Sequence, residues 1–420
     1  MRDHSGHIEV SRERAVAMLG DAVAFAPATE TIPLSPDCVG RVLAEDVVAL
    51  LDMPNCLTCR MDSVAVHWDD FKDGMPDTAG WQRGREWEFA NTGIGMPEGF
   101  DTAIVIEHVK LGEDNASIAF EAPPSKQFAG TSPAGSRMHA GDVLAAAGSV
   151  LTPLLIAHIA SGNNTEVPVI ARPKVAFIPT GSELVAPGSD VPRGKNIETN
   201  SLLAASKIAA WGGECIVWDI VPDDPEAIKA AVLDAARTCD IVVINAGSSK
   251  GNDDWNIEML EEIGHVLYHE TNHGPGHHSS GSIVEGTPVV GISGPPAGAG
   301  FTMDFYLYPL MQRYFGQPVD LPKIEVRLKE DFSKKGPQAK QSPDASAKGE
   351  VRPSVVSDGR EFFGIKQLRL EMQGAEIWAA PATSSHVGAP EANTMDCYFG
   401  VSSLRETPRK GDTITVDLRP

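Results

Sequence analysis

Residues 171–184 read Ala171-Arg172-Pro173-Lys174-Val175-Ala176-Phe177-Ile178-Pro179-Thr180-Gly181-Ser182-Glu183-Leu184. The apolar run from Val175 to Ile178 lies between Pro173 and a Pro-Thr-Gly turn. A short apolar run with such boundaries is typical of a buried strand. We therefore predict a strand that ends near Thr180 and continues into a polar loop facing a ligand.

The sequence that follows continues the alternation of strands and helices. Residues 200–213 carry apolar side chains at helical spacing and end at Gly212-Gly213, and residues 215–221 form a second apolar run. Residues 225–239 then predict an amphipathic helix with proline at its start, and residues 241–244 a third strand. This order predicts a doubly wound α/β domain, with a parallel sheet covered by helices on both faces.

Two polar loops follow predicted strands, at residues 180–183 and 247–254. Ligands of parallel sheets bind beyond the carboxyl ends of the strands. Backbone N–H groups in Gly/Ser-rich turns before a helix also suit an anion such as phosphate. The two loops therefore predict a ligand site, although the alternative that glycine and serine only form the turns is equally consistent with the composition.

Length and charge limit the classes of function. The chain has 420 residues and a formal net charge of −22, which predicts roughly two to four domains and argues against a nucleic-acid-binding surface. No apolar run approaches the ~18–20 residues of a membrane span, and the first residues lack the apolar core of a signal peptide. We expect a cytoplasmic protein with neither membrane nor nucleic-acid partners, and its six scattered cysteines indicate reduced thiols.

Several short motifs resemble one known family. Gly40-Arg41-Val42-Leu43-Ala44-Glu45-Asp46-Val47, then Met53-Pro54 and Met61-Asp62, resemble the molybdopterin molybdenumtransferases, the molybdenum insertases that include bacterial MoeA and the E domain of gephyrin. The resemblance continues in order through residues 92–93, 96–103, 140–144, 151–153, 179–184, 198–200 and 221–225. The resemblance covers nearly the whole chain, and it rests on the number and order of the motifs.

The resemblance implies a four-part multidomain layout. A scaffold domain would comprise residues 1–47 and 144–170, and an inserted β-rich lobe would comprise residues 48–143. A doubly wound, molybdopterin-binding domain would follow at 171–316, and a C-terminal β-barrel-like domain at 317–420. Members of this family are homodimers whose cleft joins the doubly wound domain of one subunit to the Met-Asp loop of the other, so a homodimer is expected.

The implied activity is insertion of molybdate into adenylylated molybdopterin with release of AMP, which makes the protein a magnesium-dependent transferase. Carboxylates would hold Mg²⁺, and the resemblance assigns Asp62 and Asp254 as catalytic residues and, with Asn252, as magnesium or oxyanion-site residues. The residues expected to bind the molybdopterin substrate are Thr180, Gly181, Ser182, Glu183, Gly247, Ser248, Ser249, Lys250 and Gly294.

Two departures from the family pattern keep a second interpretation open. Asn252 stands where an aspartate is usual, and Gly274-Pro275-Gly276-His277-His278 replaces a turn that usually carries two lysines. Loss of these charges weakens the binding of magnesium and of oxyanions. The alternative is therefore a binding protein that holds or delivers molybdopterin or the finished cofactor after losing the insertion chemistry.

A third interpretation is a metal site of thiolates and imidazoles. Cys56 and Cys59 form a Cys-x-x-Cys pair, and five histidines lie within residues 265–278. Gly274, Pro275 and Gly276 exclude a helix through His277. Cys56, Cys59, His273 and His277 are ligand types that suit Zn²⁺, but a single Cys-x-x-Cys pair often binds nothing.

Overall fold

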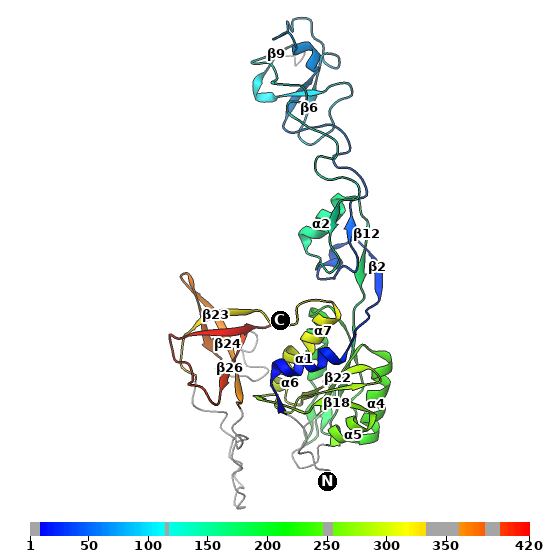
Figure 1. Ribbon diagram of the computed structural model, residues 1–420, viewed down its shortest axis with the longest axis vertical. Coiled ribbons are helices and arrows are strands. Elements are labelled where there is room, and N and C mark those ends of the chain that lie inside the picture. The colour runs from blue at the N-terminus through cyan, green and yellow to red at the C-terminus, as the bar shows by residue number, and fades with distance from the viewer. Residues whose placement is uncertain (1–8, 114–116, 247–254, 333–360, 383–394) are drawn as a thin grey trace, which may run out of the picture. The chain divides into compact units, whose positions relative to one another are not determined.

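The computed structural model describes residues 9–113, 117–246, 255–332, 361–382 and 395–420. Contacts divide the chain into two compact units, each shown in Figure 1. The larger unit comprises residues 1–28 and 171–420, and the smaller unit comprises residues 29–170. No helix in the described ranges is long and apolar enough to cross a membrane.

A six-stranded sheet forms the centre of the larger unit. Its order is β16 (Glu214–Val217), β13 (Lys174–Pro179), β17 (Ile241–Ala246), β22 (Thr287–Ser293), β21 (Ser280–Val284) and β18 (Gly264–Tyr268). The first four strands are parallel, whereas β21 and β18 are antiparallel to their neighbours. The predicted doubly wound domain is thus confirmed, with an antiparallel extension at one edge.

Helices cover both faces of this sheet (Figure 1). On one side lie α4 (Pro225–Thr238) and α5 (Trp255–Ile263), and on the other α1 (Arg12–Ala22), α3 (Asn200–Ala210), α6 (Pro296–Thr302) and α7 (Tyr308–Tyr314), the last two joined by the π-helical turn η4 (Met303–Leu307). Alternation along the strands explains the two layers. Val175 and Phe177 of β13 pack towards the α3 side, and Ala176 and Ile178 pack towards the α4 side.

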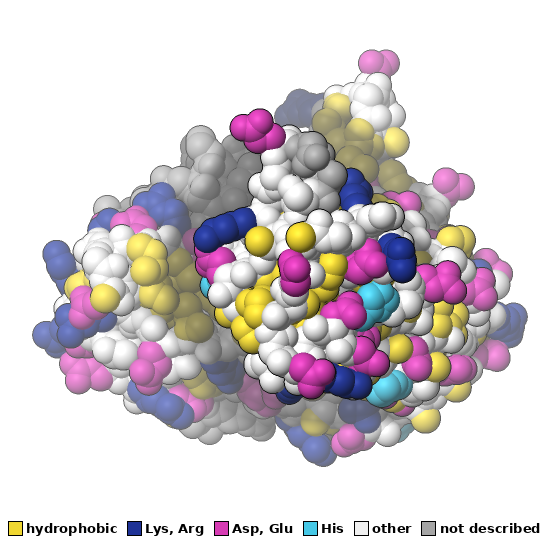
Figure 2. All heavy atoms as spheres, turned by 90° about the horizontal axis from the view of Figure 1, so that it is seen from above, with side chains coloured by type: hydrophobic (Ala, Val, Ile, Leu, Met, Phe, Trp, Pro, Cys, Tyr) yellow, Lys and Arg dark blue, Asp and Glu magenta, His cyan; other side chains and the backbone are white. Residues whose placement is uncertain are grey.

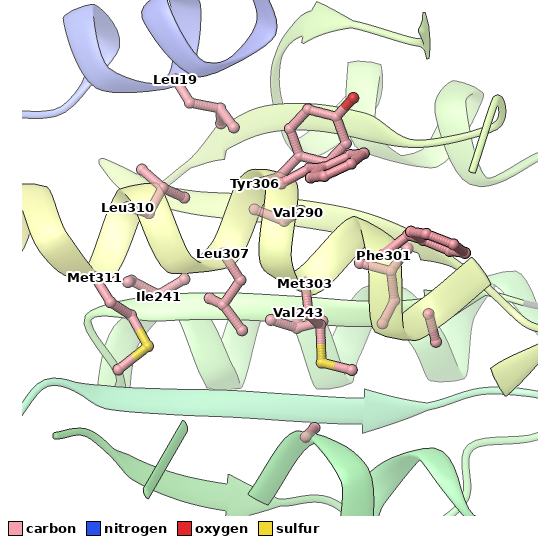
Figure 3. Packing of buried hydrophobic residues seen from close by; sticks show 14 of the residues in the cluster. Leu19, Ile241, Val243, Val290, Phe301, Met303, Tyr306, Leu307, Leu310 and Met311 are labelled. Carbon is pink, nitrogen blue, oxygen red and sulfur yellow. The ribbon is translucent and has the colours of Figure 1, made fainter. Parts of the chain in front are cut away.

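The continuous helical segment from α6 to α7 is buried between the sheet and α1. Figure 3 shows Met303, Leu307 and Met311, spaced four residues apart, pointing from it towards the strand that carries Ile241 and Val243. Tyr306 and Leu310 lie on the side that faces α1. An apolar surface on both sides explains why this segment has few charged residues.

The C-terminal region forms a closed five-stranded β-barrel, as predicted. Its strands are β23 (Lys323–Leu328), β24 (Phe363–Gln373), β25 (Glu376–Pro381), β26 (Cys397–Ser402) and β27 (Thr413–Leu418). The order β24-β25-β23-β27-β26 closes because β26 also pairs with β24. The two-residue strand β20 (His273–Gly274) pairs with β24. Backbone hydrogen bonds therefore join the segment between β18 and β21 to the barrel.

Four more short strands of the larger unit form two pairs. β1 (Glu9–Val10) is parallel to β19 (Glu270–Thr271), and β14 (Leu184–Val185) is parallel to β15 (Asn196–Ile197). Ser11 caps α1 through its side chain, as the sequence predicts. Ala15 and Leu19 of α1 are buried in the core around the central sheet. This packing places α1 in the larger unit, although we predicted it in the scaffold domain; the four-part layout itself remains a prediction.

In its described residues, the smaller unit is built of short strands and one α-helix. Near its chain ends lie β2 (Thr29–Pro33), η1 (Pro36–Cys38), β3 (Val47–Val48), β11 (Val143–Ala145), α2 (Pro153–Ser161) and β12 (Glu166–Ile170). The intervening segment holds β4 (Thr58–Cys59), β5 (Ser63–Val66), η2 (Trp68–Phe71), β6 (Trp87–Ala90), β7 (Thr102–Val105), η3 (Ile106–His108), β8 (Val109–Leu111), β9 (Ile118–Phe120) and β10 (Thr131–Ser132). On the face drawn in Figure 2, acidic and basic side chains are interspersed.

Candidate functional site

The strand order of the central sheet creates a ligand-binding edge. From β13 the chain crosses to β16 on one side, whereas β17 is followed in the parallel part of the sheet by β22 on the other side. A crevice outside the carboxyl ends of the strands is expected where the winding reverses in this way, between β13 and β17. Register pairs Pro179 with Asn245 and Ala246 with Ser293, so Thr180 and Gly294 follow directly at the same edge.

Two buried asparagines connect the strand ends at this edge. Asn200, the first residue of α3, donates from Nδ2 to Asn245 Oδ1 and to Gly294 O, each at 2.8 Å. Asn245 Nδ2 donates to Ser293 O at 3.0 Å, and the Thr180 hydroxyl donates to Asn245 O at 3.0 Å. These bonds bring the predicted binding residues Thr180 and Gly294 into one network.

Two polar atoms of this region are left unpaired. Within the described residues, Asn200 Oδ1 and Ser293 Oγ are buried and have no hydrogen-bond partner. A buried polar atom without a partner costs about 1–3 kcal/mol, so such atoms are uncommon away from functional sites. Asn200 Oδ1 can only accept, and it therefore suits an N–H or O–H donor supplied from outside the described structure.

The turn at residues 181–183 is held rigidly beside the network. Gly181 has φ +146°, a backbone conformation that residues with a Cβ atom rarely adopt, so this position favours glycine. The Ser182 N–H donates to Asp223 Oδ2 at 2.9 Å, and Ser182 Oγ accepts from Asp223 N at 3.0 Å. The Ser182 N–H that we expected to bind an anion is thus paired with a carboxylate of the chain itself.

The second predicted loop lies outside the described residues. It contains Gly247, Ser248, Ser249 and Lys250 of the expected binding residues, together with Asn252 and Asp254 of the expected magnesium site. Their assignments remain predictions.

Asp62 lies in the smaller unit, just before β5, and its carboxylate is exposed. Its Oδ1 accepts from both the backbone N–H and the hydroxyl of Thr92, each at 2.9 Å. These two hydrogen bonds lower the pKa of the Asp62 carboxyl. Asp62 is therefore negatively charged at neutral pH, as a carboxylate ligand of magnesium must be, and its charge fits a hard cation.

The two cysteines of the Cys-x-x-Cys pair, in the smaller unit, lie in different environments. Cys59 is buried, and its thiol donates to Met61 O at 3.1 Å, whereas Cys56 is exposed. A buried thiol that is already hydrogen-bonded to a carbonyl is a poor start for a metal site. The structure thus gives no support to Cys59 as a metal ligand, and the zinc site of thiolates and imidazoles remains a prediction.

His273 lies in the larger unit, and both of its ring nitrogens form hydrogen bonds within that unit. Its Nδ1 lies 3.0 Å from Pro275 O, which can only accept, so Nδ1 carries the proton. Its Nε2 then accepts from the Tyr306 hydroxyl at 2.5 Å. Burial lowers the pKa of His273 to about 4. The lone pair that would bind a metal is therefore already used by Tyr306.

Sequence reasoning did not identify Asn200 and Asn245 as site residues. Asn245 ends an otherwise apolar strand, and Asn200 begins a helix with no side-chain cap from Thr199. A polar residue at the carboxyl end of a buried strand is a usable signal. The pairing of the two side chains depends on tertiary contacts and is not visible in the sequence.

Comparison with known proteins gives matches over most of the chain. Residues 10–162 match the model of the MoeA N-terminal region (domain I and II), and residues 176–313 match that of a probable molybdopterin binding domain. Among curated relatives, the molybdopterin molybdenumtransferase of Haemophilus influenzae is 27% identical over 316 residues, which cover 73% of this chain and 78% of the relative. Molybdopterin molybdenumtransferase 2 of Mycobacterium tuberculosis (strain ATCC 25618 / H37Rv) is 26% identical over 314 residues, covering 69% and 76%.

Solved structures agree with this at the level of the fold. Two structures of a molybdopterin biosynthesis MoeA protein from Pyrococcus horikoshii superpose with TM-scores of 0.76 and 0.71. Each is 23% identical, and the alignments cover 98% of this chain and 99% and 100% of the respective structures. The similarity in fold therefore covers 98% of the chain.

Proposed function

The chain belongs to the molybdopterin molybdenumtransferase family, the MoeA proteins of molybdenum cofactor biosynthesis, and we propose that it binds adenylylated molybdopterin at the carboxyl edge of its central sheet. There it inserts molybdate and releases AMP. The relatives named above carry the name molybdopterin molybdenumtransferase, which gives the transferase class. The release of AMP rests on the resemblance to the family.

The observation that carries the substrate site is the asparagine network with its unpaired acceptor. Asn200 is 5% exposed and Asn245 3% exposed, and both lie at the point where the winding of the sheet reverses. A pterin presents N–H donors and a carbonyl acceptor along one edge. Asn200 Oδ1 accepts one such donor, and the Asn200–Asn245 bond fixes the orientation of this acceptor before the ligand arrives.

Each group then has one role. Asp62 supplies a fixed negative charge, oriented by Thr92, and together with Asp254 and Asn252 would hold Mg²⁺. When bound, the magnesium ion supplies positive charge that neutralises the phosphate oxygens of the substrate. The glycine at 181 keeps the 180–183 turn close to the strand ends. We further propose that the protein acts as a homodimer in the cytoplasm.

The test is molybdate-dependent release of AMP by the purified full-length chain with adenylylated molybdopterin and magnesium. The matched variants are Asp62→Asn, which keeps an oxygen for the two Thr92 bonds but removes the charge, and Asp69→Asn, which changes an exposed carboxylate elsewhere in the smaller unit. We expect Asp62→Asn to lower the rate by about 10²-fold or more and Asp69→Asn to leave it unchanged. Equal rates in wild type and Asp62→Asn would contradict the assignment.

The carrier interpretation is favoured by the turn at residues 274–278. Gly276 O accepts from the Ser279 hydroxyl at 2.6 Å and from the Thr271 hydroxyl at 3.2 Å, so two hydroxyl groups help to hold this turn in place. The two lysines usual in the family are absent from it. Binding of molybdopterin without release of AMP, measured in the same assay with a titration of the pterin, would establish the carrier in place of the transferase.

A further inference from the structure

The N-terminal strand of the larger unit brings two carboxylates together. Glu9 of β1 and Glu270 of β19 are direct partners in the parallel pair, and Glu270 begins the segment that turns back at residues 276–278. The turn is closed by the bond from Thr271 N to His277 O at 2.9 Å. This pairing places the His277 ring beside both acids.

The three side chains lie close to one another. His277 Nε2 lies 3.5 Å from Glu270 Oε2, and His277 Nδ1 lies 3.9 Å from Glu9 Oε2. One ligand atom from each of the three residues lies within 4.8 Å of the others. The side chains of Glu9 and His277 are only 14% and 16% exposed. Two carboxylates held this close repel each other unless a proton or a cation lies between them.

The tautomer of His277 supplies an independent argument for that charge. Its Nδ1 lies 2.5 Å from the carbonyl oxygen of Thr271, which can only accept, so Nδ1 carries a proton. In the neutral ring Nε2 then holds a lone pair, and it faces another acceptor, Glu270 Oε2. A histidine that donates one ring N–H to a backbone carbonyl and presents the other nitrogen to a ligand is the usual arrangement at metal sites.

We propose that Glu9, Glu270 and His277 Nε2 bind one divalent transition-metal ion, for which Zn²⁺ is the best match. Imidazole nitrogen and carboxylate oxygen bind Zn²⁺ at about 2.0–2.2 Å, which puts tetrahedral ligand atoms about 3.3–3.6 Å apart. The observed 3.5 Å between His277 Nε2 and Glu270 Oε2 has this spacing. The imidazole favours zinc over magnesium or calcium, whose ligands are oxygens.

His278 supports the site from the same turn. Its Nδ1 lies 3.6 Å from Glu270 Oε1, the carboxylate oxygen that does not face His277. His278 is therefore placed to orient Glu270, as outer partners of metal ligands do.

The ion would join two parts of the larger unit. It would tie β1, next to the described start of the chain, to the segment of residues 270–277, which contains β20. This segment lies between β18 and β21 of the central sheet, and β20 joins it to the barrel through backbone pairing with β24. Its role is structural, and it differs from the thiolate and imidazole site predicted from Cys56, Cys59, His273 and His277.

The test is zinc binding by the full-length chain after removal of metal with a chelator, measured by equilibrium dialysis with metal analysis. We expect one tightly bound Zn²⁺ per chain in the wild type. Its loss is expected in His277→Gln and in Glu9→Gln, with affinity falling by more than the ~10–100-fold that follows removal of an outer-shell partner. The matched control is His108→Gln, since His108 faces the single carboxylate of Glu121 at 3.5 Å.

Two further measurements separate the outcomes. The Cys56→Ser, Cys59→Ser double variant is expected to keep the ion, and Co²⁺ in place of zinc is expected to show no thiolate charge-transfer band. Unfolding temperatures of the metal-free variants show whether each still folds, which makes a loss of zinc attributable to the lost ligand. A wild type without tight zinc, or His277→Gln with an unchanged tight zinc, would overturn the proposal.

Discussion

The imidazole of His273 is held neutral inside the larger unit, and this has a consequence for stability. Burial lowers its pKa from 6.5 to about 4. Below about pH 6.5 the unfolded chain therefore binds a proton that the folded chain does not, so this group destabilises the fold as the pH falls from about 6.5 towards 4. Above pH 6.5 the effect is absent.

We predict that His273→Asn makes stability less sensitive to acid. Between pH 7.5 and pH 5, the wild type should lose about 2 kcal/mol more of its free energy of unfolding than the variant. Urea unfolding of both proteins at the two pH values measures this difference. His108→Gln, at an exposed site, serves as the control; an identical loss in wild type and His273→Asn would show that His273 is not the group responsible.

Individual site residues were predictable where the chemistry is local. Gly181 was expected in the binding turn, and its φ of +146° is a backbone conformation that favours glycine, whereas its role in binding remains a prediction. The side-chain partners were not predictable. The Ser182 N–H is paired with Asp223, and Asn200 with Asn245, because segments 41 and 45 residues apart meet only in the folded chain.

At the scale of elements, the π-helical turn η4 contains a fully buried carboxylate, Asp304. It forms an ion pair with Lys207 of α3 and accepts a hydrogen bond from the Tyr398 hydroxyl of β26, and Arg419 Nε lies 3.8 Å away. A carboxylate in a low-dielectric interior is tolerated only with such partners. Asp304 thus links a helix beside the central sheet to the barrel.

We predict that Asp304→Asn lowers the free energy of unfolding by about 3–5 kcal/mol, because Lys207 is left buried without its counter-charge. Chemical denaturation monitored by circular dichroism measures the change. Combining Asp304→Asn with Lys207→Met removes the unpaired charge and is expected to restore part of the stability. A loss below about 1 kcal/mol in the single variant would mean that the pair is effectively solvated.

Hydrophobic periodicity predicted the bounds of some helices and strands more accurately than those of others. The strand predicted at residues 175–178 and the helix at 225–239 correspond to β13 and α4 within one or two residues. The predicted strand at 215–221 ends at Val217, after which only Val221 forms a bridge, to Thr180. The point at which β16 ends was not predictable, because it depends on where its pairing with the neighbouring strand β13 stops.

At the scale of the molecule, the alternation of strands and helices predicted the doubly wound domain, and the family resemblance implied the C-terminal barrel. The doubly wound domain and the closed barrel are both present. Helix α1 was the exception. Its amphipathic pattern predicts a helix but not the surface that it covers, and Leu19 packs into the core of the larger unit because α6, η4 and α7 present an apolar side to it.

The proposal of a homodimer makes a prediction about mixed subunits. The family resemblance implies that Asp62 of one subunit serves the same cleft as the sheet edge of its partner. If so, Asp62→Asn and Asn200→Ala subunits, each inactive alone, form heterodimers with one intact cleft and one cleft that carries both changes.

Random mixing makes about half of the dimers heterodimers, so about a quarter of the wild-type rate should return. AMP release after the two variants are unfolded and refolded together measures this, and each variant refolded alone is the control. If both residues served a cleft within one chain, every cleft in the mixture would carry a change and no activity would return. Recovery of activity would therefore locate Asp62 and Asn200 on opposite sides of a subunit boundary, because no other arrangement of the two variants leaves a cleft unaltered.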